Sequence, residues 1–162
     1  MRSEPAAVGP ISRPRSIDEL DRGVIEELQR NGREPFRRIA SRLGVAEATV
    51  RARYERLVAD GVLQVTAVTN PLALGFDATA MIGVRTSGAP EPVAEALGAW
   101  PEVTYVVVAA GRFDLLVETV CSDLAALLEL TGRLRALDGV ATTETLLYLK
   151  LCKQLYDWGT RR

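Results

Sequence analysis

The chain has 162 residues, a formal net charge of −1 and no histidine. Hydrophobic residues make up 48% of it and charged residues 25%, which is typical of a soluble globular protein and excludes disorder of the whole chain. The lack of histidine removes the usual general base near neutral pH, the commonest transition-metal ligand, and the Ser–His and Cys–His nucleophile pairs. We therefore predict a protein that is not an enzyme and holds no cofactor or metal.

The start of the chain and the two cysteines bear on its location. Residues 1–16, MRSEPAAVGPISRPRS, contain three prolines and no apolar block, so they predict a flexible tail and not a secretory signal. No apolar run reaches the roughly 18 residues that a membrane span requires. Cys121 and Cys152 lie in apolar surroundings without metal-type spacing, which predicts buried, reduced thiols. These features favour a cytoplasmic protein that does not contact the membrane.

Three helices are predicted in the first part of the chain. Apolar residues recur at helical spacing over about 17–30, 35–43 and 47–59. Ser16 is the expected N-cap of the first helix, with Glu19 as its capping-box partner. Gly44 closes the second helix, and Asp60-Gly61 ends the third. The expected helical domain spans residues 17–61.

After Gly61 the hydrophobic period changes to that of strands. Strands are predicted at 62–70, 77–86, 103–110, 113–120 and 140–151, and helices at about 91–99 and 122–137. In the last helix, one apolar stripe comprises Leu124, Leu127, Leu128 and Leu134. The expected fold class is α+β: an N-terminal three-helix, winged-type helix–turn–helix domain and a C-terminal ferredoxin-like βαββαβ sandwich. Residues 62–70 are the linking strand, 71–152 the α/β domain and 153–162 a C-terminal tail.

Positive charge is concentrated in the helical domain. Residues 33–56 hold seven arginines and three glutamates, although the whole chain is almost neutral. Ala40, Gly44 and Val50 have the spacing of a helix–turn–helix pair: a small residue where the helices meet, a glycine in the turn, and an apolar residue that packs the second helix. A basic helix pair on a neutral chain indicates a polyanion partner bound at one end.

The exposed side of the third helix fits double-stranded DNA. Small residues on an outward face let a helix enter the major groove, and arginine binds guanine or phosphate through two hydrogen bonds. Arginines on the preceding helix would lie near the sugar–phosphate backbone. The predicted DNA-binding residues are Arg37, Arg38, Arg42, Glu47, Ala48, Thr49, Arg51, Ala52, Arg53 and Arg56.

The chain resembles the leucine-responsive/asparagine-regulator (Lrp/AsnC) family of transcriptional regulators over residues 17–152. The matching features are Ile17-Asp18 with Asp21, Asn31-Gly32-Arg33, Ile39-Ala40, Arg53 with Leu57 and Gly61, the run GRFDLLVE at 111–118, and the run GVATTETLLYLK at 139–150. The chain departs from the family at Ala46, where a serine usually caps the recognition helix, and at Phe113, where tyrosine is commoner.

The resemblance implies a sensor in the second half of the chain. It implies a small-molecule effector, such as an amino acid, a homodimer formed through the sensor sheets and the linking strand, and further assembly into octamers. The implied effector-binding residues are Gly111, Arg112, Phe113, Asp114, Thr143 and Thr145. An arginine and an aspartate in one turn would suit the carboxylate and ammonium groups of a zwitterion.

Two alternatives have different partners. Some proteins that resemble the family are sirohaem decarboxylases with the same two-domain layout, but they rely on histidine, which is absent here. The other alternative is a ligand-binding module whose helices contact a protein. The salt dependence of binding distinguishes this alternative from DNA binding, because phosphate contacts make the affinity for DNA fall steeply as the salt concentration rises.

Overall fold

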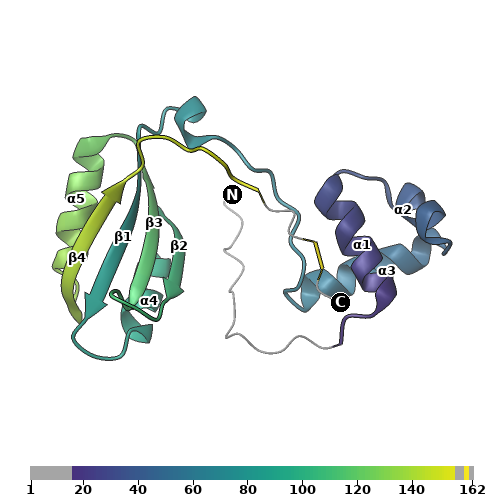
Figure 1. Ribbon diagram of the computed structural model, residues 1–162, viewed down its shortest axis with the longest axis horizontal. Helices are drawn as coiled ribbons and strands as arrows, with labels where there is room; N and C mark the ends of the chain where they lie inside the picture. The colour runs from purple at the N-terminus through teal and green to yellow at the C-terminus, as the bar shows by residue number, and fades with distance from the viewer. Residues whose placement is uncertain (1–15, 156–158, 161–162) are drawn as a thin grey trace. The chain divides into compact units, whose positions relative to one another are not determined.

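The computed structural model describes residues 16–155 and 159–160. The expected tail at residues 1–16 lies, apart from Ser16, outside the described residues. The chain divides into two compact units, one reaching to Ala67 and the other running from Val68 to Cys152 (Figure 1). Residues 153–155 and 159–160 group with the first unit, where the Thr160 hydroxyl donates to Glu26 Oε1 at 2.6 Å.

The first unit is helical. Its helices are α1 (Glu19–Arg30), α2 (Phe36–Leu43) and α3 (Glu47–Ala59), which confirms the three predicted helices. Their buried apolar residues form one core: Val24, Ile25, Leu28, Ile39, Ala40, Val50 and Leu57. Each helix contributes an apolar stripe to this core, as the helical period of the sequence requires.

The cap of α1 differs from the prediction. Asp18, not Ser16, is the N-cap, and its carboxylate accepts from the Asp21 backbone N–H at 2.9 Å. The Asp21 carboxylate accepts in return from the Asp18 backbone N–H at 3.1 Å, which completes a capping box. The prediction was wrong because it assumed the serine–glutamate form of this motif, whereas two aspartates three residues apart satisfy the same backbone donors.

The segment at 62–70 forms no strand within the described chain. It is extended and largely exposed, and it leads into a short 3-10 helix, η1 (Pro71–Leu74). The prediction of a linking strand is therefore not met in a single chain. A strand exists only where its backbone groups pair with a neighbour, and hydrophobic alternation does not show whether a neighbour is present.

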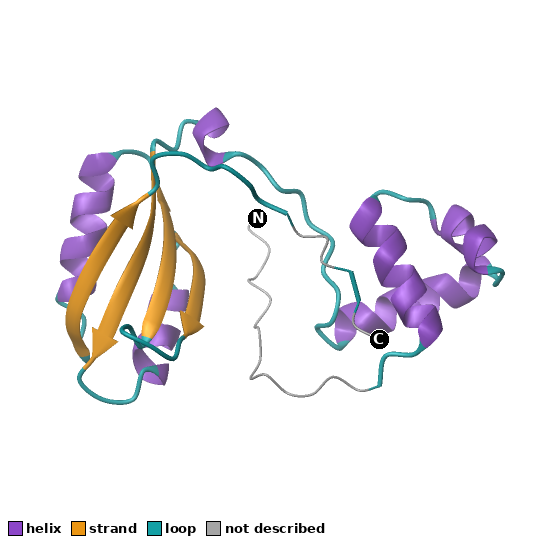
Figure 2. Cartoon of the chain, viewed as in Figure 1, coloured by secondary structure: helices purple, strands orange, loops and turns teal. Residues whose placement is uncertain are grey.

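The second unit is a four-stranded antiparallel sheet with helices. Its elements are β1 (Ala78–Thr86), α4 (Glu91–Gly98), β2 (Val103–Val108), β3 (Leu115–Cys121), α5 (Leu124–Arg135) and β4 (Val140–Leu147). The strand order is β2-β3-β1-β4, so the two strands that follow the helices lie at the edges (Figure 2). This arrangement confirms the predicted α+β class and the ferredoxin-like βαββαβ order.

The helices cover one face of this sheet. The core under them contains Ala80, Ile82 and Val84 of β1 and Leu115 and Val117 of β3. On α5 the predicted stripe is half wrong: Leu127 and Leu134 are buried, but Leu124 is 61% and Leu128 is 73% exposed. Leu130 and Thr131 fill the buried face instead. Residues 124 and 128 lie about 60° to 100° around the helix from Leu127, on a side that is open to solvent.

The structure bears on the predicted burial of the two cysteines and on membrane spans. Cys121 is buried, as predicted, but Cys152 is exposed, which corrects the prediction of two buried thiols. Burial raises the pKa of the Cys121 thiol above its ordinary value. Among residues 16–155 and 159–160, no helix is long and apolar enough to cross a membrane.

Candidate nucleic-acid interface

The α2–α3 pair has the geometry that the sequence predicts. Ala40 is buried where the two helices meet, and Gly44 ends α2 with φ of +68°, a conformation that favours glycine. The Val45 backbone N–H donates to Ala40 O at 3.1 Å across the turn. Val50, fully buried, packs α3 against the core. The pair is therefore a tight helix–turn–helix with a fixed angle.

The solvent-facing side of α3 carries small side chains. Ala48 and Ala52 are exposed, Glu47 and Arg51 are exposed beside them, and Thr49 is half-buried. No side chain caps the N-terminus of α3, because Ala46 stands at the N-cap position and makes no capping hydrogen bond. This surface has the small residues that close approach to a nucleic-acid groove requires.

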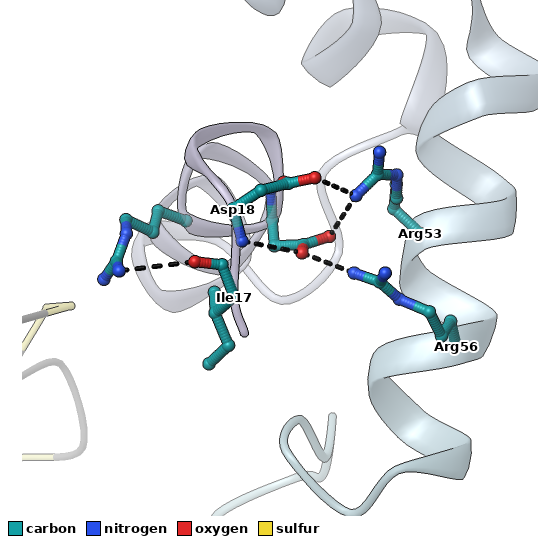
Figure 3. A network of polar contacts seen from close by, with 6 residues as sticks. Ile17, Asp18, Arg53 and Arg56 are labelled. Carbon is teal, nitrogen blue, oxygen red and sulfur yellow. Dashed lines mark hydrogen bonds and ion pairs between the residues drawn. The ribbon is translucent and has the colours of Figure 1, made fainter. Parts of the chain in front are cut away.

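Two of the predicted DNA-binding arginines are bound to acids of α1 (Figure 3). Arg53 Nη1 donates to Asp21 Oδ1 at 3.1 Å and forms a second ion pair with Asp18. Arg56 forms an ion pair with the other oxygen of Asp21. The side chain of Asp21 is fully buried, whereas that of Arg53 is 29% exposed. These arginines hold the helices together, a role that the sequence interpretation did not assign to them.

Arg42 of α2 is held in the same way. It forms an ion pair with Glu27 of α1, and its Nη2 lies 3.4 Å from Glu34 Oε1. Glu27 also accepts from Arg30 Nη1 at 2.7 Å. Both glutamates are buried, Glu27 with 5% of its surface exposed. Arg42 therefore neutralises two buried carboxylates and ties α2 to α1.

The other predicted arginines are directed to solvent. Arg38 and Arg37 are exposed, and Arg38 makes only a 3.9 Å contact with Glu34. Within the described part of the chain, Arg37 has no ion pair. Arg51 lies over the Phe36 ring at 5.1 Å and reaches Glu47 at 3.4 Å. These three arginines form the accessible positive surface of the pair.

Sequence reasoning missed the acids that face the arginines. Asp18 and Asp21 are three residues apart, as are Arg53 and Arg56, so two acids on one turn of α1 match two arginines on one turn of α3. That matched spacing is visible in the sequence and is the signal that could have identified the network. Counting the arginines as a free positive surface overlooked it.

Two ion-paired carboxylates, those of Glu27 and Asp18, predict how the stability of the first unit changes with pH. Burial by itself would raise the pKa of Glu27, but hydrogen bonds from Arg42 and Arg30 outweigh it and lower the pKa below its ordinary value of 4.5. The pKa of Asp18 is lowered by the hydrogen bond from the Asp21 backbone and by Arg53. In both cases the unfolded chain takes up the proton first. Their stabilisation is therefore complete above pH of about 4.5 and is lost as pH falls through the folded values.

Glu27→Gln tests this expectation. We expect the variant to lose about 1–2 kcal/mol of unfolding free energy at pH 7, because the arginine partners are partly solvated. The difference from the unchanged chain should narrow as pH falls below 4.5. Urea unfolding from pH 3 to pH 7, followed by circular dichroism, measures it. A difference that stays constant over this range would contradict the assignment.

The predicted effector residues divide between the two faces of the sheet. Arg112 belongs to the face that the helices leave open, because it forms an ion pair with Glu144, and Glu144 lies opposite Gly83 on that face. Phe113 lies on that face against Gly83, with the Arg112 guanidinium 4.8 Å from the ring centre. Thr143 and Thr145 are opposite Val84 and Ile82, on the helix-covered face. The structure therefore does not bring all six residues together within one chain.

Asp114 has a structural role in the turn that begins at Gly111. Its Oδ2 accepts from the Thr86 backbone N–H at 2.8 Å, and its backbone N–H donates to Val84 O at 2.9 Å. Gly111 has a φ of +151°. The carboxylate is half-buried and fixes the end of β1 against this turn, so only part of its hydrogen-bonding capacity is open to a ligand.

The helix-covered face has a small open pocket of about 270 Å³ near Thr145. Its lining residues are Leu124, Leu127, Leu128, Thr131, Arg135 and Thr145. The buried Thr145 hydroxyl has no hydrogen-bond partner among the described residues, and Arg135 Nε donates to the neighbouring Thr143 hydroxyl at 3.1 Å. The two threonines thus belong to a different surface from the 111–114 turn.

Comparisons with known proteins agree with both units. Residues 17–58 match the AsnC-type helix-turn-helix domain, and residues 79–157 match the Lrp/AsnC ligand binding domain. The HTH-type transcriptional regulator FL11 of Pyrococcus furiosus is 34% identical, covering 85% of this chain and 93% of that protein. The regulatory protein AsnC of Escherichia coli is 30% identical, covering 83% of this chain and 91% of that protein.

Solved structures give the same relationship. That of E. coli AsnC has a TM-score of 0.73 at 29% identity, covering 88% of this chain and 98% of that one. That of the Mycobacterium tuberculosis leucine response regulatory protein LrpA has a TM-score of 0.79 at 26% identity, covering 85% and 95%. The paired domain matches, in the order that the fold requires, place this chain in the Lrp/AsnC family of helix-turn-helix transcriptional regulators.

Proposed function

We propose that this regulator binds double-stranded DNA through α2 and α3 and that a small molecule such as an amino acid, bound in the second unit, changes its affinity for DNA. In this proposal residues 17–61 bind DNA, residues 62–70 link the units, and residues 71–152 sense the effector and join subunits. The protein acts in the cytoplasm and catalyses no reaction. The observation that carries the proposal is the exposed, alanine-lined side of α3 with Arg51 at its edge and Arg37 and Arg38 on the preceding helix.

The predicted DNA-binding residues contribute in two ways. Glu47, Ala48, Thr49 and Ala52 lie on or beside the surface that would enter the groove, while Arg37, Arg38 and Arg51 would contact phosphates or base edges. Arg42, Arg53 and Arg56 support that surface through their ion pairs with α1. A helix pair of this size contacts few base pairs, so useful specificity requires two copies related by a twofold axis.

The open face of the sheet supports a homodimer. It carries exposed apolar side chains from two strands and the segment after β4, among them Tyr105 at 52%, Leu146 at 47% and Tyr148 at 37% exposure. Apolar patches of this kind on a sheet face are typical of subunit interfaces. We propose that a second copy covers this face and that such dimers assemble further into octamers.

The proposed effector region is the turn from Gly111 to Asp114, with Thr143 and Thr145 contributing from the other face of the sheet in the assembled particle. The match to the Lrp/AsnC ligand binding domain supports a small ligand, and the leucine response of M. tuberculosis LrpA supports an amino acid. Arg112, exposed at the tip of the turn, would bind the ligand carboxylate once Glu144 releases it.

One titration tests the proposed function. The full chain is titrated against a fluorescent duplex from the region upstream of its own gene, at about 50 to 200 mM salt, with and without each of the twenty amino acids. Several phosphate contacts per subunit predict that affinity falls by orders of magnitude over this salt range. At least one amino acid should shift the affinity, and Asp114→Ala should reduce that shift. Salt-independent binding would favour a protein partner instead of DNA.

A further inference from the structure

We propose that Asp21 is a positioning residue for the recognition helix. It sets the rotation and height of α3 by holding Arg53 and Arg56, so these two arginines support the DNA-reading surface without reading DNA themselves. The inference rests on the proposed DNA binding and adds to it a residue of α1 that would not touch the nucleic acid.

The first argument is that both oxygens of the Asp21 carboxylate accept hydrogen bonds. Oδ1 accepts from Arg53 Nη1 at 3.1 Å, and Oδ2 accepts from the Asp18 backbone N–H at 3.1 Å and from Arg56. The residue is fully buried, so water does not compete for these bonds. A buried carboxylate with both oxygens bound to two guanidinium groups has one orientation, and it transmits that orientation to both partners.

The second argument is the match between two helical turns. Asp18 also accepts from Arg53, so two acids on the first turn of α1 face two arginines three residues apart on α3 (Figure 3). If α3 slid along its axis or rotated about it, Arg53 and Arg56 could not both keep their partners. The apolar core alone permits such movement more easily, because packing of apolar groups is less directional than charged hydrogen bonds.

The third argument concerns which arginine side chains of α3 remain available to contact DNA. The Arg53 side chain is only 29% exposed, and Arg56, although 44% exposed, has its guanidinium paired with the buried Asp21, whereas Ala48 and Ala52 face solvent. Arg51 lies on the other side of α3, over the Phe36 ring. Phosphate contacts from α3 therefore fall to Arg51, while Arg53 and Arg56 determine where Arg51 and the alanine surface meet the groove.

The sign of a charge effect distinguishes positioning from simple electrostatics. Asp21→Asn removes a negative charge from the DNA-binding unit with almost no change in shape, and electrostatics alone would then strengthen binding to a polyanion. If Asp21 positions α3, the same change weakens binding, because one carboxylate oxygen becomes an NH2 group, which cannot accept from the arginine that it faces. Glu19→Gln is the matched control, since Glu19 is an exposed acid in the same helical turn.

The experiment measures DNA affinity of the full chain at 10 °C by fluorescence anisotropy, with circular dichroism to establish that each variant is folded. We expect Asp21→Asn to bind about tenfold more weakly, comparable to one mismatched base pair in the site. Glu19→Gln should bind equally well or slightly better. Should Asp21→Asn fail to fold, Asp18→Asn is tested in its place, with a loss of several-fold expected.

A salt titration adds a readout that loss of stability would not change. Arg51→Ala should reduce the slope of log affinity against log salt by about one, as expected for a lost phosphate contact. Arg56→Ala should lower affinity and leave that slope unchanged. The inference is overturned if folded Asp21→Asn binds as well as the unchanged chain or if Arg56→Ala reduces the slope as Arg51→Ala does. If the unchanged chain binds no DNA, the proposed function fails and the inference fails with it.

Discussion

Leu57→Ala is expected to unfold the first unit at temperatures where the second unit remains folded. Leu57 is 2% exposed and belongs to a core of only seven buried apolar residues. Truncating a buried leucine costs about 2–5 kcal/mol, which is a large share of the total stability of a unit this small. Differential scanning calorimetry should show one transition moving down by ten degrees or more, on the order of 4–8 °C per kcal/mol. DNA binding should be lost at the same temperature.

Val58→Ala is the control for that variant. Val58 is the next residue of α3 and is 42% exposed, so its truncation should change the unfolding free energy by no more than about 0.5 kcal/mol. The two units have separate cores, so the transition of the second unit should stay in place in both variants. If Leu57→Ala lowered both transitions together, the units would unfold as one cooperative body.

Gly83→Val is expected to destabilise the second unit and to displace Phe113. A Cβ atom at Gly83 would lie 2.5 Å from Cδ2 of the Phe113 ring, closer than carbon atoms can approach. Overpacking of this kind costs about 1–3 kcal/mol. Because Phe113 belongs to the proposed effector turn and lies under Arg112, the variant should also lose its response to an amino acid. Calorimetry and the DNA titration with added amino acids measure the two effects.

A second substitution separates the clash from other causes. Phe113→Ala removes the three ring atoms nearest to a Cβ at Gly83, so adding Gly83→Val to that variant should not lower its stability further, since valine also favours strands more than glycine does. Gly88→Ala is the control, because no atom lies within 4 Å of a Cβ placed there. If the double variant were less stable than Phe113→Ala alone, the close contact with the ring would not explain the loss.

The predicted ends of helices and strands agreed with the structure where turn residues and hydrophobic period were clear in the sequence. The range of α3 agreed with the prediction at both ends, because Asp60-Gly61 and the helical period define it without help from the rest of the fold. The order of strands and helices in the second unit also followed, since the change from helical to alternating period is a property of the chain itself. Family membership was inferred from the resemblance of local runs, such as Asn31-Gly32-Arg33 and GRFDLLVE at 111–118, and the two domain matches confirm it.

Long-range pairing was the part that sequence reasoning got wrong or missed. Leu124 and Leu128 appeared to belong to the buried stripe, but tertiary packing decides which side of α5 is covered, and these two residues are exposed. The 62–70 segment alternates like a strand, yet it has no neighbour in the described chain with which to pair. Sequence spacing does not show which face of a sheet a residue occupies, and only the register of β4 on β1 places Thr143 on the opposite face from Glu144, the partner of Arg112.

The sequence by itself determined the three helices of the first unit and the order of strands and helices in the second, that a helix–turn–helix precedes an α/β unit, and that arginine is concentrated on the helix pair. These are local properties, set by periodicity, turn residues and composition within a few residues of each position. Only the tertiary structure decided which arginines pair with buried acids of α1. Arg53 and Arg51 look alike in sequence, but an ion pair depends on what lies across the gap, and Asp21 is 32 residues away along the chain from the arginine that it holds.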